Sequence, residues 1–263
     1  MSNEKPEITV TVLGSGTCVP SLERSSCSVM LEVEGTIPLF DSGPGTMRRL
    51  LRTNTTIFEV DYIFYSHFHP DHSAELVPFL FSTKYPDMGQ RHRVLSIVAG
   101  RGFDEFFAGL KSVYGKWIEL EPGLIEIIEM NNQSADSRRM KEFTVRSAPV
   151  EHNPESIAYR VTSAGGYSVV YSGDTDYSES LIELSKDADI LICESALPDD
   201  LRLKGHLTPS LAGDIATRAG VRKLVLTHFY PECDQTDIKQ ECRKTYDGPL
   251  VLAEDLMRIE IGL

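Results

Sequence analysis

Short apolar runs recur along the chain, and most of them end at a polar residue. Such runs, bounded by turn residues, predict buried strands. We predict strands at 8–13, 28–33, 37–40, 60–65, 94–98, 124–128, 143–148, 157–162, 167–171, 190–193, 223–227 and 257–261. Helical patterns between several of these runs predict helices at 46–51, 74–81, 103–114, 178–185, 209–219 and 236–246. The pattern is that of a mixed α/β chain rich in strands.

The length of the chain bears on its domain organisation. A chain of 263 residues, 41% of them hydrophobic, is long enough to bury one sizeable α/β core. Glycine and proline are scattered as turn residues, and neither a low-complexity segment nor an internal repeat divides the sequence. We therefore expect residues 1–263 to form a single domain.

The highest density of potential metal ligands lies at residues 67–72, whose sequence is HFHPDH. Imidazole nitrogen and carboxylate oxygen suit zinc and similar first-row metals, and ligands this close together indicate two ions rather than one. The segment follows directly on the apolar run 62–65, so it begins where a strand is predicted to end. The sequence therefore predicts metal-assisted chemistry.

Several other polar residues also come just past apolar runs. They are Asp41, His152, Asp174, Glu194 and His228. Loops at the carboxyl ends of strands can bring distant residues to one rim of an α/β fold. We expect these residues to converge on one site with residues 67–72, whereas His92, between two arginines, is interpreted as solvated.

Charge and cysteine content narrow the classes of partner. The formal net charge of −13 disfavours binding along a phosphate backbone, which calls for a basic stripe. Basic clusters at 48–52, 91–93 and 138–141 are interpreted as solvated charges on helices and loops. The five cysteines include no C-x-x-C pair, so neither a disulfide framework nor a thiolate zinc site is expected. RNA is a possible partner but not the favoured one.

The amino terminus and the apolar runs bear on localisation. Residues 1–7 are polar and acidic, and no apolar run approaches the length of a membrane span. We expect a cytoplasmic protein that makes no contact with a membrane.

The candidate ligands together resemble the metal-ligand series of the metallo-β-lactamase superfamily. The matching residues are His67, His69, Asp71, His72, His152, Asp174 and His228. Further segments resemble motifs of its ribonuclease Z-like branch: LGSGT at 13–17, DSGPGT at 41–46, Glu194, and GHLTP at 205–209. The resemblance implies an α/β fold with four layers, the αββα sandwich. It also favours a homodimer, with the apolar patterns at 76–81 and 103–114 as one interpretation of its interface and packing on the sheet as the other.

The ligands that the resemblance implies form two sets bridged by Asp174. They are His67, His69 and His152 for one ion, and Asp71, His72 and His228 for the other. A metal-bridging hydroxide would attack the substrate, because two ions roughly 3.5–4 Å apart lower the pKa of water and neutralise growing charge. Two zinc ions are expected, with manganese or iron as alternatives.

Three carboxylates and one further histidine are expected to act beyond simple ligation. Asp71 would orient or deprotonate the attacking water as well as bind metal. His206 would donate a hydrogen bond or proton to the reacting phosphate or leaving oxygen, with Glu194 orienting it and favouring its protonated form. Asp41 would support the site from its turn through hydrogen bonds, and a plain turn aspartate is the alternative.

The favoured function is a binuclear metal-dependent hydrolase, a phosphodiesterase whose partner is a small-molecule phosphodiester. The segment between His152 and Asp174 is short and predicts two strands joined by a turn at 164–166, which leaves no room for the long tRNA-gripping arm of some ribonucleases Z. The alternatives are an ester, lactone or thioester hydrolase, a tRNA 3′-end endoribonuclease, and a non-hydrolytic binding protein. Loops at 84–93 and 133–139 are expected to form the pocket walls.

Overall fold

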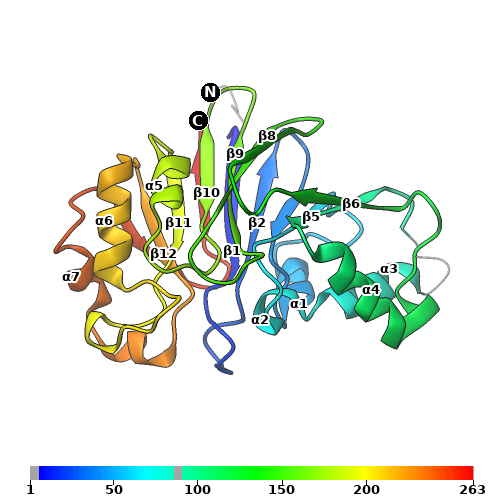
Figure 1. The fold of residues 1–263 in the computed structure, drawn as a ribbon, viewed down its shortest axis with the longest axis horizontal. Helices are drawn as coiled ribbons and strands as arrows, with labels where there is room; N and C mark the ends of the chain where they lie inside the picture. The colour runs from blue at the N-terminus through cyan, green and yellow to red at the C-terminus, as the bar shows by residue number, and fades with distance from the viewer. Residues whose placement is uncertain (1–5, 86–90, 263) are drawn as a thin grey trace.

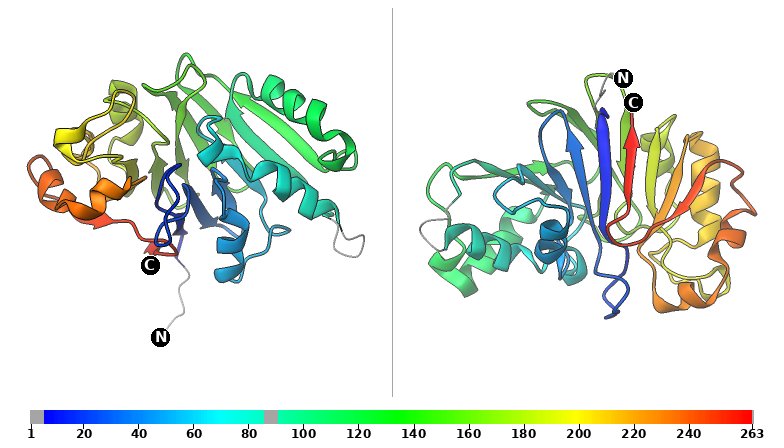
Figure 2. Two further views of the ribbon diagram at one scale, coloured as in Figure 1. Left: turned by 90° about the horizontal axis from the view of Figure 1, so that it is seen from below. Right: turned by 180° about the vertical axis from the view of Figure 1, so that it is seen from behind.

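The computed structural model describes residues 6–85 and 91–262, so residues 1–5 and residues 86–90 of the expected pocket loop lie outside the described residues. Two β-sheets lie face to face at its centre (Figures 1 and 2). The first contains β1 (Ile8–Gly14), β2 (Ser28–Val33), β3 (Pro38–Phe40), β4 (Tyr62–Tyr65), β5 (Leu95–Gly100), β6 (Ile125–Met130) and β14 (Arg258–Ile261). The second contains β7 (Asp136–Arg139), β8 (Thr144–Pro149), β9 (Ile157–Thr162), β10 (Ser168–Tyr171), β11 (Ile190–Glu194), β12 (Leu224–Thr227) and β13 (Leu250–Leu252).

Helices cover the outer sides of both sheets (Figure 1). Those beside the first sheet are α1 (Thr46–Arg52), α2 (Pro70–Ser73), α3 (Leu76–Lys84) and α4 (Phe103–Tyr114), with the 3₁₀ turn η2 (Gly115–Trp117). Those beside the second are α5 (Glu179–Ser185), α6 (Pro209–Ala219) and α7 (Ile238–Cys242), with the 3₁₀ turns η3 (Asp199–Leu201) and η4 (Pro231–Gln235). The chain thus forms the expected four-layer αββα sandwich. Within the described ranges no helix has the length and apolar character needed to cross a membrane.

Each sheet combines a parallel and an antiparallel part. The strand orders are β14-β1-β2-β3-β4-β5-β6 and β13-β12-β11-β10-β9-β8-β7. Strands β3 to β6 are parallel, as are β10 to β13, whereas the other pairs are antiparallel. Parallel strands place their carboxyl ends at one edge, and Asp41, His67, Asp174 and His228 follow the ends of β3, β4, β10 and β12. The parallel parts therefore carry the site.

Side chains that alternate along the strands of the first sheet fill an apolar layer on each of its faces. Phe64 and Val98 belong to the layer between the sheets, where Phe64 stacks on Phe40 with ring centroids 4.8 Å apart. Ile63 and Ile97 belong to the layer between the first sheet and its helices. Because both faces of the central strands are buried, these strands read as continuous apolar runs.

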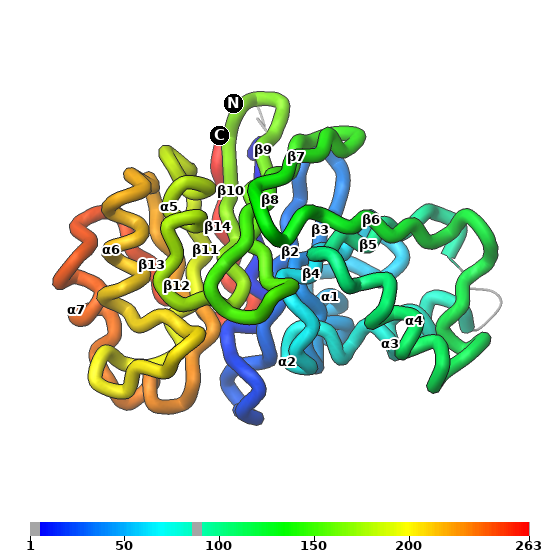
Figure 3. Tube along the Cα trace, viewed as in Figure 1, coloured from blue at the N-terminus to red at the C-terminus, as the bar shows by residue number. Residues whose placement is uncertain are grey.

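Two strands escape prediction, β7 because its sequence is polar and β13 because it is short. The prediction of a loop at 133–139 is wrong for β7, which reads DSRR and pairs with β8 at the edge of the second sheet (Figure 3). An edge strand that faces solvent does not need apolar side chains. β13 is only three residues long, and the helix predicted at 236–246 is confined to Ile238–Cys242.

The interpretation of the basic clusters as solvated charges is wrong at two positions. Arg91 is 2% exposed, and its guanidinium donates to the carbonyl oxygens of Ile57 at 2.6 Å and Val60 at 2.8 Å. Arg49 is partly buried and pairs with Asp255 at 2.7 Å. Both arginines tie loops to the body of the fold, so neither is available to bind a polyanion.

Candidate metal centre

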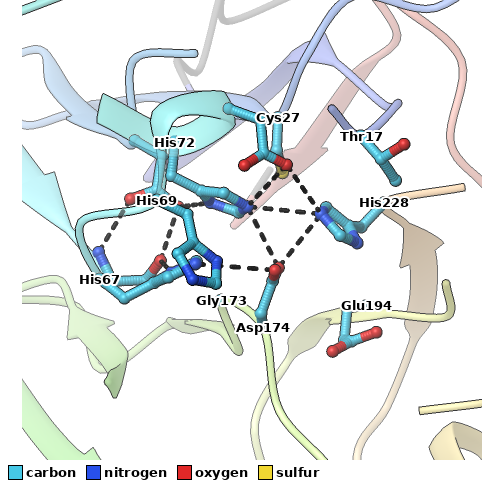
Figure 4. Close-up of polar contacts among 12 residues, drawn as sticks. Thr17, Cys27, His67, His69, His72, Gly173, Asp174, Glu194 and His228 are labelled. Atoms are coloured by element: carbon cyan, nitrogen blue, oxygen red, sulfur yellow. Dashed lines mark hydrogen bonds and ion pairs between the residues drawn. The ribbon is translucent and has the colours of Figure 1, made fainter. Parts of the chain in front are cut away.

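The predicted ligands gather at the rim formed by the carboxyl ends of the parallel strands (Figure 4). They come from the segment that follows β4 and enters α2, and from the loops after β8, β10 and β12. They are His67, His69, Asp71, His72, His152, Asp174 and His228. The structure therefore brings together every residue that the sequence singles out as a ligand.

The first cluster consists of His67, His69 and His152 with one oxygen of Asp174. Its ligand atoms lie within 4.8 Å of one another. Asp174 Oδ2 lies 3.7 Å from His67 Nε2 and 3.9 Å from His152 Nε2. His152 Nε2 lies 3.4 Å from His69 Nδ1, so three imidazole nitrogens and one carboxylate oxygen surround one point.

The second cluster consists of Asp71, His72 and His228 with the other oxygen of Asp174. The ligand atoms of its first three members also lie within 4.8 Å of one another. Asp174 Oδ1 lies 3.2 Å from the Nε2 atoms of both histidines, and Asp71 Oδ2 lies 3.7 Å from each of them. Asp174 thus presents one carboxylate oxygen to each cluster.

Asp41 supports both clusters from beneath. Its Oδ2 accepts hydrogen bonds from His72 Nδ1 at 2.8 Å, Ser66 Oγ at 2.8 Å and the Tyr171 hydroxyl at 2.7 Å. Ser66 Oγ in turn lies 3.0 Å from His67 Nδ1. A carboxylate behind an imidazole orients the ring and raises its basicity. The structure thus shows the hydrogen bonds predicted for Asp41, which a plain turn aspartate would not need.

The other imidazoles of the first cluster have neutral partners. His152 Nδ1 donates to the carbonyl oxygen of Gly205 at 2.8 Å. His69 Nε2 lies 3.0 Å from the side-chain amide of Asn153. These contacts orient the two rings without adding negative charge behind them.

His67 and His69 of the first cluster differ from His72 of the second in the direction in which their surroundings shift the pKa. Burial and the neighbouring charge of His72 lower the pKa of His67 well below its usual value, and burial also lowers the pKa of His69. Both imidazoles are therefore neutral at pH 7, which is the form that binds metal. For His72 burial favours the neutral ring, but the carboxylates of Asp174 and Asp41 outweigh burial and raise its pKa well above its usual value. The second cluster is thus a region that strongly attracts positive charge.

Two buried polar atoms test whether a metal fits these clusters. His67 Nε2 and Asp174 Oδ1 have no hydrogen-bond partner among the described residues. Leaving such an atom unpaired in the interior costs about 1–3 kcal/mol. Both atoms face the clusters, where a cation would satisfy them, and the set of imidazoles and carboxylates is one that zinc and related metals prefer. The residues present fit the implied metal.

His206 lies beside the clusters and is held by Glu194. Its Nδ1 is 3.1 Å from Glu194 Oε1 and 4.0 Å from Asp174 Oδ2. Burial disfavours the imidazolium, but Glu194 outweighs burial and raises the pKa of His206 to about 9. The backbone N–H groups of Thr175 at 2.6 Å and Leu207 at 3.2 Å fix the Glu194 carboxylate. The predicted pairing of His206 with Glu194 is confirmed.

Three residues near the centre are not singled out by the sequence. Asn153 contacts His69, and the ring of Tyr230 lies 6.3 Å from that of His228. Asn153 and Tyr230 each lie within two residues of a predicted ligand in the sequence, and this proximity is the only sequence signal that could have identified them. The third is Cys27, a buried thiol whose pKa burial raises to about 12, so it stays neutral and is not a nucleophile.

An αββα sandwich with histidine and aspartate metal-binding clusters at its rim is the architecture of a metal-dependent hydrolase. A family model described as the beta-lactamase superfamily domain matches residues 38–229. The chain therefore belongs to the metallo-β-lactamase superfamily.

Individual relatives agree with this assignment. Ribonuclease Z of Haloarcula marismortui is 30% identical, over 94% of this chain and 95% of the relative. The metallo-beta-lactamase fold protein YhfI from Bacillus subtilis matches with a TM-score of 0.84 and 24% identity, over 97% of this chain and 100% of that one. The short form of human tRNase Z matches with a TM-score of 0.76 and 24% identity, over 97% of this chain and 100% of that one. Within its superfamily the chain is ribonuclease Z-like.

Proposed function

We propose that the protein is a binuclear metal-dependent phosphodiesterase that hydrolyses a small phosphodiester. The observation that carries the proposal is the Asp174 carboxylate, whose two oxygens each face a separate ligand cluster, as expected of a carboxylate shared by two ions. When bound, a pair of zinc ions, or of manganese or iron ions, lowers the pKa of water and neutralises charge on a phosphoryl oxygen.

Asp71 is the residue proposed to orient or deprotonate the attacking water. Its side chain is 12% exposed, against 3% for Asp174, so it is the carboxylate that solvent can reach. Burial disfavours its anion, but a hydrogen bond from His228 and the charge of His72 outweigh burial and lower its pKa. Asp71 is therefore an anion at neutral pH and can accept a proton from water.

His206 is proposed to act on the substrate rather than on the ions. Because its Nδ1 is bound to Glu194, its Nε2 is left to donate to the reacting phosphate or to the leaving oxygen. The loop that carries it is tied to the first cluster, since the carbonyl of Gly205 accepts the hydrogen bond from His152. The position of His206 is thereby set relative to the ligands.

Two observations support a small substrate. Strands β9 and β10 pair directly, with a tight turn in which the Gly166 N–H donates to the Ser163 carbonyl at 3.1 Å, so a hairpin lies where a tRNA-gripping arm would have to emerge. The net charge of −13 also opposes a long polyanion.

A tRNA 3′-end endoribonuclease is the second candidate, and the names of the relatives favour it. Cleavage of RNA is itself hydrolysis of a phosphodiester, so these names support the proposed chemistry as well. The alignment with the Haloarcula marismortui relative spans 299 positions, more than the 263 residues of this chain. That relative therefore carries insertions that this chain lacks, which supports a smaller substrate here.

Hydrolysis assays on metal-analysed protein test the proposal. Bis-p-nitrophenyl phosphate would be compared with p-nitrophenyl acetate, a lactone and a precursor tRNA, and a chelated sample would serve as the control. We expect metal-dependent cleavage of the phosphodiester. Turnover of the ester or lactone alone would contradict the proposal and indicate a carboxylic ester hydrolase, whereas cleavage of the tRNA alone would indicate the second candidate.

A further inference from the structure

Tyr230 lies beside the metal centre without belonging to either cluster. It comes two residues after His228, and its ring stands nearly perpendicular to the imidazoles of His228 and His206, with centroids 6.3 and 6.5 Å away. Those two imidazoles stack on each other at 5.6 Å. The tyrosine ring therefore forms a wall on the side of the centre where His206 lies.

Backbone contacts hold Tyr230 in this position. Its N–H donates to the carbonyl of Ala196 at 3.0 Å, and its own carbonyl accepts from the Cys233 N–H at 3.0 Å. The Phe229 N–H donates to the carbonyl of Ser15 at 2.9 Å. These bonds tie the segment to the loops after β11 and β1, so the ring is placed without any help from its hydroxyl group.

The Tyr230 hydroxyl itself has a weak partner. Among the described residues its hydrogen bond is with Cys18 Sγ, 3.6 Å away, in an exposed part of the loop after β1. A thiol sulfur is a poor acceptor for a phenol proton. A phenol is protonated at neutral pH and can donate a hydrogen bond. The hydroxyl therefore keeps its proton and is a donor with little to bind.

We propose that the Tyr230 hydroxyl binds the substrate by donating a hydrogen bond to a non-bridging phosphate oxygen on the side that His206 faces. This inference rests on the proposed phosphodiesterase function and names a residue that would recognise the phosphate. Hydrogen bonds to an anionic oxygen are about twice as strong as those between neutral groups, so the phosphate would displace the contact with Cys18. Cys18 then holds the hydroxyl in place only while the site is free.

The variant Tyr230→Phe removes the hydroxyl and keeps the ring. We expect it to raise the KM for bis-p-nitrophenyl phosphate and the Kd for inorganic phosphate about ten-fold, with metal content unchanged. Phosphate binding to metal-loaded protein is measured by calorimetry, which does not depend on turnover. Tyr114→Phe is the matched control, because Tyr114 is 43% exposed on α4, and it should keep the wild-type values.

A second variant separates direct from indirect action. If Tyr230 touches the phosphate, Cys18→Ala should keep phosphate affinity close to that of the wild type, because only the resting contact is lost. A Cys18→Ala protein with the same loss as Tyr230→Phe would overturn the proposal, since Tyr230 would then act only by placing the loop. Equal phosphate Kd values for Tyr230→Phe and the wild type would overturn it as well.

Different results would contradict the proposed phosphodiesterase function and the proposed role of Tyr230. A wild-type protein that binds metal but cleaves no phosphodiester would contradict the proposed function. In that event a weaker phosphate affinity of Tyr230→Phe would still support the hydroxyl as a phosphate-binding group, and an unchanged affinity would remove it.

Discussion

The two ligand clusters of the metal centre differ in burial and in what supports their imidazoles. His69 of the first cluster is exposed, whereas the imidazole of His72 in the second is fully buried. The imidazole of His72 is hydrogen-bonded to the buried carboxylate of Asp41, whereas that of His69 contacts only the neutral amide of Asn153. The first cluster therefore contains an exposed ligand with a neutral partner, whereas the second contains a buried ligand that is hydrogen-bonded directly to a carboxylate.

This difference predicts unequal affinities for the two proposed metal sites. A partner that orients a ligand and raises its basicity strengthens metal binding. We therefore expect the second cluster to hold its ion more tightly and the first to exchange its ion more readily.

The largest effect is expected from Asp174→Ala, which removes the one residue that both clusters share. Bound metal should fall at both clusters, and kcat should fall at least about 1000-fold because stabilisation worth several kcal/mol is lost. Metal analysis with bis-p-nitrophenyl phosphate kinetics would show it. Asp247→Ala, at an exposed aspartate, is the control. Retention of two ions by Asp174→Ala would contradict the shared role.

His206→Ala should lower kcat about 100-fold, which is within the range for loss of a positioned proton donor. His206 forms a third possible metal-binding group with Asp174 and His228, but its Nδ1 is held by Glu194 and the seven predicted ligands remain, so metal content should stay close to that of the wild type. Glu194→Gln should give a smaller loss, since the imidazole remains but its proton is held less firmly. A His206→Ala protein without its metals would contradict the role assigned here.

Asp41→Asn tests the carboxylate that contacts His72 directly and His67 only through Ser66. Affinity for the tighter ion should fall about 10–100-fold, the usual cost of losing an outer partner of a ligand. Asparagine suits the positive φ of 56° at this position, so the turn should keep its shape. Competition with a chelator measures the affinity, and thermal unfolding serves as the control for the fold. An unchanged affinity for the tighter ion would show that the charge of Asp41 is not what distinguishes the clusters.

Asn153→Ala makes the matching change at the first cluster and should have the smallest effect. One neutral hydrogen bond is lost, so affinity for the weaker ion should fall about five-fold. The same competition assay applies. A loss as large as that of Asp41→Asn would erase the proposed difference between the clusters.

The sequence predicts most of the fold because the strands of the core are buried on both faces. The strands at 28–33 and 157–162 and the helices at 103–114 and 209–219 agree with the structure to the residue. β7 could not be predicted in this way, since its stability comes from pairing with β8 rather than from burial of its own side chains.

The candidate site could be predicted by residue type but not by contact. The ligands are recognisable because His and Asp occur at strand ends in an unusual density. Which oxygen of Asp174 faces which cluster depends on how two sheets meet, and no local pattern contains that information. The same holds for Arg91, whose charge suggests the surface although backbone carbonyls 31 and 34 residues earlier bind it in the interior.

The most direct test of a centre built for two ions is a zinc titration of chelator-stripped protein. Bound zinc and hydrolysis of bis-p-nitrophenyl phosphate would be followed together as zinc is added. The structure predicts about two ions per chain with unequal affinities, and activity that rises as the second, weaker site fills. Full activity at one ion per chain, with no second ion bound, would contradict the shared role of Asp174 and the two-cluster account.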